Sequence, residues 1–215
     1  METKTAKWIT IAGCGPGDPS FLTGATIEAV KTAEVLAGTE HLLAMFPDNG
    51  VEKIKFGIDT VEFLSRIENL RGRKVVVLVT GDPGIGSLAD SVIERFGTAA
   101  CIVIPGISSV QLAFARIGVS WQNVFVLDAH AGLPMFEPGS LMKHPKIAIL
   151  VGSRDSRQWV EQAVRELTGT LDVIICRDLS LPSEKILRVT GAKPVSINDL
   201  EGRCIVVMLR KGILN

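Results

Sequence analysis

The sequence contains no tyrosine, few aromatic residues and no excess of charge of either sign. Lysine plus arginine number 23 among its 215 residues, aspartate plus glutamate also number 23, and the formal net charge is zero. A chain without a positive field and with few aromatic rings is poorly equipped to hold a phosphate backbone or to stack on bases. These absences argue against a nucleic-acid-binding protein.

Long apolar runs and closely spaced cysteines are also missing. No apolar stretch approaches the roughly 20 residues of a membrane-spanning helix, so no membrane protein is expected. The N-terminal segment lacks the charged start and apolar stretch of a signal peptide. No C-x-x-C pair occurs, and we therefore expect buried free thiols and a reducing, cytoplasmic compartment. The cysteines are Cys14, Cys101, Cys176 and Cys204.

Hydrophobic residues make up 47% of the chain, which is enough to build a substantial core. Short β-branched runs alternate with amphipathic segments, and this alternation predicts an α/β fold. Residues 74–80 (KVVVLVT) are the clearest case, because a continuous apolar run is typical of a strand buried on both faces. The expected strands are 8–12, 35–38, 74–80, 101–104, 124–127, 146–151, 173–176 and 205–209; the expected helices lie within 26–36, 61–70, 88–96, 108–117 and 155–167.

The second half has its own alternation of strands and helices, which indicates two α/β domains. Residues 110–122 are the expected junction, and the expected domains are 1–112 and 113–215. Residues 129–145 contain three prolines at positions 134, 138 and 145, so this segment is predicted to be a loop and not a helix.

Three expected strands of the first half end in unusual loops, at 13–18 (GCGPGD), 81–86 (GDPGIG) and 105–109 (PGISS). Because the carboxyl ends of parallel strands meet at one edge, we expect these loops to share a crevice. The first loop does not fit a dinucleotide fingerprint, since Asp18 stands where the third glycine belongs. A P-loop is excluded because its G-x-x-x-x-G-K-[ST] pattern is absent.

Each loop carries groups suited to a ligand. Glycines allow the backbone to approach a ligand closely. Asp82 can accept hydrogen bonds from a ribose or balance a cationic sulfonium, and Ser108 or Ser109 offers a hydroxyl at the start of a helix. Taken singly, each loop is also explained as a tight turn or a plain helix cap. Their common placement at strand ends is what predicts a binding site.

The order and spacing of these three motifs resemble those of the tetrapyrrole (corrin/porphyrin) methylase family. The resemblance covers nearly the whole chain. It implies two α/β domains with S-adenosylmethionine bound in the cleft between them, a homodimer and a cytosolic enzyme. Carried over position by position, it assigns cofactor contacts to Pro16, Gly81, Asp82, Ile85, Ser108, Ser109 and, through its backbone, Val151.

Within this family, residues 153–156 (SRDS) and 181–186 (LPSEKI) resemble the branch that methylates C5 of a cobalt-precorrin in cobalamin (vitamin B12) biosynthesis, or that forms the equivalent half of a precorrin-6Y C5,15-methyltransferase. The resemblance thus implies a small-molecule tetrapyrrole substrate. The cobalt of that substrate travels with the ring, so no metal site is expected in the protein. We expect no second methyltransferase domain after Asn215, and we therefore expect that a separate partner methylates C15 and removes the carboxylate.

His130 starts the long loop after the expected strand 124–127. The branch carries a histidine here followed by Gly-Arg; the histidine is kept in this sequence and the Gly-Arg is not. Loops at strand ends concentrate substrate-facing groups, and imidazole titrates near physiological pH. We predict that His130 hydrogen-bonds a ring carboxylate or accepts the ring proton after methyl transfer; a polar loop residue is the alternative. His41 and His144 are assigned no role.

Carboxylates on the substrate call for local positive charge, because the chain has no net charge. Arg116, Lys143, Arg154 and Arg157 are the candidates. Transfer from a sulfonium to a ring carbon needs mainly proximity and alignment, so it leaves no nucleophile motif to identify the reaction. The alternatives are methylation at another precorrin position, uroporphyrinogen methylation, diphthine synthesis on a protein side chain, or a non-catalytic S-adenosylmethionine-binding homologue.

Overall fold

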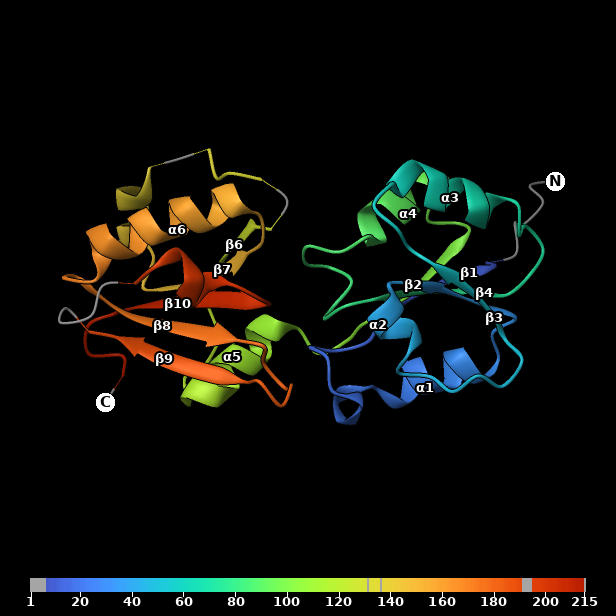
Figure 1. Cartoon of the computed structure of the whole chain (residues 1–215), viewed down its shortest axis with the longest axis horizontal. Helices are drawn as coiled ribbons and strands as arrows, with labels where there is room; N and C mark the ends of the chain where they lie inside the picture. The colour runs from blue at the N-terminus through green and yellow to red at the C-terminus, as the bar shows by residue number, and fades with distance from the viewer. Residues whose placement is uncertain (1–6, 131, 136, 191–194, 215) are drawn as a thin grey trace. The chain divides into compact units, whose positions relative to one another are not determined.

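The computed structural model describes residues 7–130, 132–135, 137–190 and 195–214. The chain divides into two compact units, unit 1 (Met1–Ser108) and unit 2 (Ser109–Asn215). Within the described residues, each unit holds one five-stranded sheet with helices packed on it, which confirms the α/β fold class (Figure 1). The division lies a little before the expected boundary after residue 112, which would cut through helix α5 (Ser109–Ile117).

The sheet of unit 1 is parallel throughout, in the order β3-β2-β4-β1-β5. Parallel neighbours require crossover connections, and helices supply them here. The strands are β1 (Ile9–Gly13), β2 (Val35–Gly38), β3 (Glu52–Lys55), β4 (Val75–Val79) and β5 (Cys101–Ile104). The helices are α1 (Gly24–Lys31), α2 (Glu40–Leu43), α3 (Thr60–Glu68) and α4 (Ala89–Phe96), with a short 3-10 helix η1 (Pro19–Phe21).

Both faces of this sheet are covered, as the apolar run of β4 predicts. Val75, Val77 and Val79 pack in one core with the buried side chains of α3 and α4. Val76 and Leu78 point to the other face, into a core that contains Leu42 and Leu43 of α2. Figure 1 shows α3 and α4 on the side of the sheet opposite α1.

Unit 2 has a mixed sheet in the order β6-β7-β10-β8-β9. The pair β6–β7 is parallel, whereas β7–β10, β10–β8 and β8–β9 are antiparallel. Helix α6 (Arg154–Leu167) packs its apolar stripe on one face, and α5 lies on the other (Figure 1). The strands are β6 (Phe125–Ala129), β7 (Lys146–Val151), β8 (Leu171–Arg177), β9 (Lys185–Val189) and β10 (Cys204–Arg210), and the 3-10 helices are η2 (Pro138–Lys143) and η3 (Ile197–Leu200).

Two expectations from the sequence are wrong in part. The helix expected within residues 26–36 ends at Lys31, because Thr32 bonds the last carbonyls with its hydroxyl and Val35 and Leu36 belong to the buried strand β2. The loop expected over 129–145 contains η2, which Pro138 begins at a position where a helix needs no backbone N–H.

Candidate functional site

The three glycine-rich loops of unit 1 lie side by side. They follow β4, β1 and β5, which are consecutive neighbours in the parallel sheet, so their carboxyl ends share one edge. The first two loops are joined directly, since Gly81 N–H donates to Gly15 O at 2.7 Å and Gly15 N–H donates back to Gly81 O at 3.3 Å. The meeting of these loops at one edge is thus as the parallel pattern predicts.

Glycine is required where these loops touch. A Cβ atom on Gly13 would lie 2.6 Å from Gly106 N and 2.7 Å from Gly81 O. A Cβ atom on Gly106 would lie only 2.3 Å from Gly81 O. No side chain fits at such distances from rigid backbone. The loops pack so closely that Gly13 in the first motif and Gly106 in the third cannot be replaced without a shift of the backbone.

Asp82 ties two of the loops together. Its Oδ1 accepts a hydrogen bond from Gly84 N–H at 2.8 Å, and its Oδ2 accepts one from Gly106 N–H at 3.1 Å. Each carboxylate oxygen has a second lone pair, so a ligand hydroxyl or cation can share it. Asp82 therefore organises the edge, and its contact with the cofactor stays a prediction beside that role.

The other predicted contacts of unit 1 differ in what they can offer. Pro16 is buried in the first loop and Ile85 is half-buried in the second, where its N–H donates to Asp82 O at 3.3 Å. Ser108 is 5% exposed and ends unit 1. Ser109 is half-buried and starts α5, so it belongs to unit 2. Unit 1 thus brings together Pro16, Gly81, Asp82, Ile85 and Ser108.

Thr26 also stabilises this edge of the sheet, and it was not predicted from the sequence. Its side chain is fully buried, and its hydroxyl donates to Gly13 O at 2.9 Å. Thr23, the N-cap of α1, accepts from Thr26 N–H at 3.2 Å and bonds its hydroxyl at 3.0 Å. The pattern Thr-x-x-Thr directly before an apolar helix is the signal that would have indicated this capping arrangement.

Cys14 lies in the first loop but offers no nucleophile. Its side chain is fully buried, and burial raises the pKa of the thiol to about 12. The thiolate is the reactive form, so this thiol is a neutral packing group at ordinary pH. The expectation of buried free thiols holds for all four cysteines.

His130 and Val151 come together in unit 2. Ala129 of β6 is paired with Val151 of β7, and the next residues, His130 and Gly152, are in contact. A Cβ atom on Gly152 would lie 2.7 Å from His130 Nδ1 and 2.3 Å from His130 O. The exposed imidazole therefore lies against the backbone that follows β7, while the Val151 side chain is buried and leaves only its backbone for a ligand.

An aspartate fixes the loop that carries His130. Asp128 Oδ1 accepts from His130 N–H at 2.8 Å, which forms a local turn at the end of β6. Asp128 was not predicted from the sequence, although an aspartate whose side chain accepts from the N–H two residues later is a recognised turn pattern.

The candidate cations are unequally suited to bind a substrate carboxylate. Arg116 of α5 already holds Glu184, with Nε 2.7 Å from Oε1 and a second nitrogen 3.4 Å from Oε2. The hydrogen bond raises the pKa of Arg116 and lowers the pKa of Glu184. Arg157 lies 4.0 Å from Glu201. Arg154 and Lys143 are exposed and remain the better candidates.

Two structural findings bear on other classes of function. Within the described residues, no group of three or more His, Cys, Asp or Glu side chains is arranged to hold a metal ion. Nor does the described part of the chain contain a helix with the length and apolarity that crossing a membrane requires.

Comparison with known proteins identifies relatives that match most of this chain. The chain is 31% identical to the cobalt-precorrin-7 C(5)-methyltransferase of Salmonella typhimurium over 179 residues, which cover 83% of this chain and 88% of that relative. Among solved structures, the precorrin-6Y methylase of Archaeoglobus fulgidus matches with a TM-score of 0.73 and 25% identity, over 96% of this chain and all of that one.

A uroporphyrin-III C-methyltransferase of Thermus thermophilus, solved in complex with S-adenosylhomocysteine, has the same fold. It matches with a TM-score of 0.73 at 19% identity, over 94% of this chain and 96% of that one. The family model of the tetrapyrrole (corrin/porphyrin) methylases matches residues 9–194. With nearly the whole chain matched, in sequence and in fold, this protein belongs to the tetrapyrrole methylase family.

Proposed function

We propose that this chain transfers a methyl group from S-adenosylmethionine to C5 of cobalt-precorrin-7 in cobalamin biosynthesis. Its similarity to the Salmonella enzyme over most of both chains supports this substrate. The observation that carries the proposal is the edge of unit 1, where the loops after β1, β4 and β5 are bonded to one another. Such an edge of an α/β sheet is the usual place for a ligand.

The groups at this edge fit S-adenosylmethionine, which presents a sulfonium, ribose hydroxyls and a charged amino-acid end. The Asp82 carboxylate can accept from a hydroxyl and favours positive charge near it. Backbone N–H groups of the glycine loops and the Ser108 hydroxyl can donate to the ligand. The proposed contacts are Pro16, Gly81, Asp82, Ile85, Ser108, Ser109 and Val151.

Methyl transfer requires the protein mainly to align the ring carbon with the methyl group. A pair of ring π electrons forms the new bond from carbon to methyl, and the bond from sulfur to methyl breaks with its electrons left on sulfur. The ring carbon then releases its proton, so one positive charge moves from sulfur to the proton acceptor. Holding the carbon in line with the methyl group supplies most of the rate. His130 is proposed to bind a ring carboxylate or to accept that proton.

The test is turnover of purified protein with cobalt-precorrin-7 and S-adenosylmethionine labelled with ¹³C in its methyl group. We expect one labelled methyl group on the ring, assigned to C5 by nuclear magnetic resonance. A label at another ring position would contradict the proposed substrate and assign a sibling activity. Binding of S-adenosylhomocysteine without any transfer would indicate a non-catalytic homologue.

We also propose that the enzyme is a homodimer and cytoplasmic, and that a separate protein carries out the C15 reaction. The family resemblance supports the dimer, and buried free cysteines are typical of a reducing compartment. Light scattering at micromolar concentration should give twice the chain mass, and the monomer mass would contradict it. The product made by this chain alone should gain one methyl group and release no carbon dioxide.

A further inference from the structure

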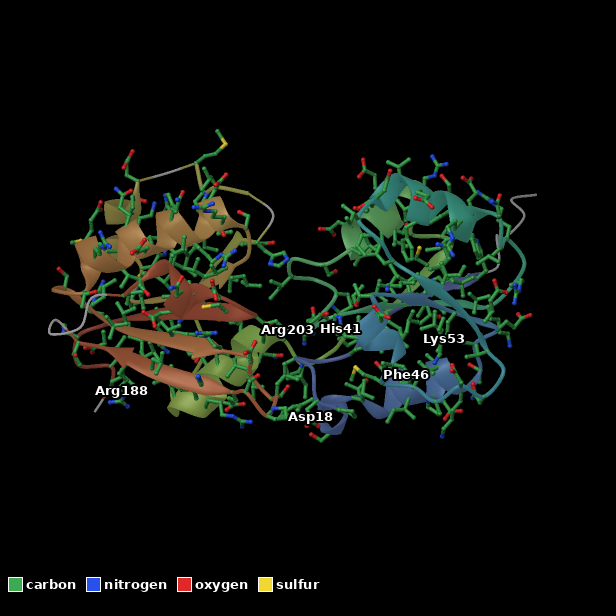
Figure 2. The ribbon with its side chains drawn as sticks, in the orientation of Figure 1. Asp18, His41, Phe46, Lys53, Arg188 and Arg203 are labelled. Atoms are coloured by element: carbon green, nitrogen blue, oxygen red, sulfur yellow. The ribbon has the colours of Figure 1, made fainter. Side chains whose placement is uncertain are left out.

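His41 lies at the same edge of the unit 1 sheet as the three loops. It is the second residue of α2, directly after β2, and the strand order puts β2 next to β4 on the side away from β1. Ala37 is paired with Val77, so the ends of these two parallel strands are neighbours. His41, labelled in Figure 2 at the start of α2, is therefore beside the loop that carries Gly81 and Asp82.

The imidazole of His41 is oriented by two threonines. Its Nδ1 lies 3.0 Å from Thr39 Oγ1, and its Nε2 lies 3.4 Å from Thr80 Oγ1. Thr39 is the N-cap residue of α2, yet its hydroxyl makes no capping hydrogen bond to that helix. A hydroxyl that a helix end would normally use is thus committed to the histidine ring, while Thr80 directly precedes Gly81.

The imidazole of His41 is exposed to solvent, and the helix that carries it is anchored in the core. Leu42 and Leu43, the next residues of α2, are 1% and 6% exposed and anchor the helix in the core. His41 and Thr80 are both exposed. The contact of Nε2 with Thr80 is the longer of the two, so it is the one that a substrate atom can replace at least cost.

We propose that His41 is the base that removes the ring proton after methyl transfer, with Thr39 as its positioning residue. The idea rests on the proposed function. In this arrangement Nδ1–H donates to Thr39 Oγ1, and the lone pair of neutral Nε2 accepts from the Thr80 hydroxyl until the substrate displaces that hydroxyl. As the proton leaves the methylated carbon, Nε2 takes it, and the electrons of the broken C–H bond return to the ring. A base held by a third group is a common catalytic arrangement.

This assignment gives His41 and His130 different roles. His130 lies in unit 2 against Gly152, and its backbone N–H donates to Asp128 Oδ1. His41 lies in unit 1, with both ring nitrogens engaged by hydroxyls. The ring-carboxylate role is then left to His130, and proton removal to His41.

The test compares His41→Gln with the wild type and with His144→Gln, a matched control whose ring stacks on Phe125 in unit 2 at 4.0 Å. For His41→Gln we expect unchanged affinity for S-adenosylhomocysteine and a loss of kcat of about a hundredfold, at the low end for a general base. With cobalt-precorrin-7 deuterated at C5, the isotope effect on kcat should rise in His41→Gln, because proton removal becomes slower than methyl transfer.

Two further variants separate a catalytic role from a structural one. Added imidazole should restore part of the turnover of His41→Ala. Thr39→Val should lower kcat and Thr39→Ser should retain it, because only the hydroxyl is needed.

Several outcomes would overturn the inference. Wild-type turnover in His41→Gln would do so while the proposed function stands. So would a loss of turnover that comes with weaker S-adenosylhomocysteine binding, no change in isotope effect and no rescue by imidazole, since that pattern indicates a structural role. A wild-type chain that transfers no methyl group at all would overturn the proposed function and this inference together.

Discussion

The two units use the same device at a strand end and build different sites from it. In unit 1, Asp82 accepts from the N–H of the residue two positions later, Gly84, at 2.8 Å; in unit 2, Asp128 does the same with His130, also at 2.8 Å. The second oxygen of Asp82 goes on to bond Gly106 in another loop. The same local turn is thus a bridge between loops in unit 1 and a support for one loop in unit 2.

Sheet topology accounts for the difference. A sheet that is parallel throughout gathers the carboxyl ends of all its strands at one edge, and unit 1 brings the loops of β4, β1 and β5 together there. A mixed sheet gathers few, and in unit 2 the parallel pair β6–β7 brings together His130 and Gly152. The cofactor-type loops therefore belong to unit 1, while unit 2 presents a histidine.

The largest expected effect comes from breaking the loop contacts of unit 1. In Gly106→Ala, the new Cβ meets Gly81 O at 2.3 Å, so the backbone of two loops must shift. We expect S-adenosylhomocysteine affinity to fall by about a hundredfold or more, since small displacements of a site cost that much, and stability to fall by roughly 1–3 kcal/mol. Titration calorimetry and urea unfolding measure the two.

Gly24→Ala is the matched control for this variant. No atom lies within 4 Å of a Cβ at that position, so affinity and stability should stay near those of the wild type. Unchanged binding in Gly106→Ala would show that the packing of these loops has no part in the site.

The aspartate comparison should give the next largest effect. Asp82→Ala removes both the bridge to Gly106 and the proposed cofactor contact, so affinity for S-adenosylhomocysteine should fall about ten- to a hundredfold, or roughly 1.5–3 kcal/mol. Asp128→Ala loosens only the loop of His130 and should leave that affinity unchanged. Equal losses in the two variants, measured by calorimetry, would erase the distinction between the units.

A smaller effect is expected from the contact of unit 2. His130→Ala should bind S-adenosylhomocysteine normally and lose at least about tenfold in methyl transfer, or ~1.4 kcal/mol. Gly152→Ala should lose at least as much, because its Cβ would lie 2.3 Å from His130 O and would shift the backbone that carries the imidazole. The double variant should then lose no more than Gly152→Ala alone, since the shifted backbone already moves the imidazole out of place. Additive losses would mean that Gly152 acts independently of His130, and full activity in His130→Ala would return that residue to a plain loop position.

How much could be predicted from the sequence depended on burial. Strands with continuous apolar runs, such as residues 74–80 and 146–151, were predicted because a buried strand consists largely of apolar residues. Strands β3 (EKIK) and β9 (KILRV) were missed, because both are edge strands with largely exposed side chains. Edge strands are defined by their neighbours, and a polar sequence does not reveal those.

The site shows the same division between local and distant information. The three loops were found because each carries its own motif. The pairing of His41 with Thr80 was not, because the two residues are 39 positions apart and meet only through the placement of β2 beside β4. Strand order is a property of the whole sheet, so no local pattern around His41 indicated its partner.

The smallest effect on the site is expected from the buried thiols. Burial raises the pKa of Cys14 in unit 1, and of Cys176 and Cys204 in unit 2, to about 12 from 9.0. The pKa of these buried thiols is higher in the folded state than in the unfolded state. Their contribution to the free energy of unfolding is therefore fully present below pH 9.0 and is lost as the pH rises toward about 12. Urea unfolding should therefore show falling stability above about pH 9, with no effect at neutral pH.

Cysteine variants locate this loss in one unit or the other. Cys176→Ala should flatten the alkaline slope while leaving S-adenosylhomocysteine binding at neutral pH unchanged. An identical slope in the variant would show that this thiol ionises as readily in the folded chain as in the unfolded one.

The central claim is that the edge formed by the loops of β1, β4 and β5 binds the methyl donor, and hydrogen–deuterium exchange tests it most directly. Exchange is followed by mass spectrometry with and without saturating S-adenosylhomocysteine. We predict slower exchange in peptides that span 13–22, 80–90 and 104–110, while peptides from α3 and β3 stay unchanged. Binding without protection in the three loop peptides, or protection elsewhere alone, would contradict the account.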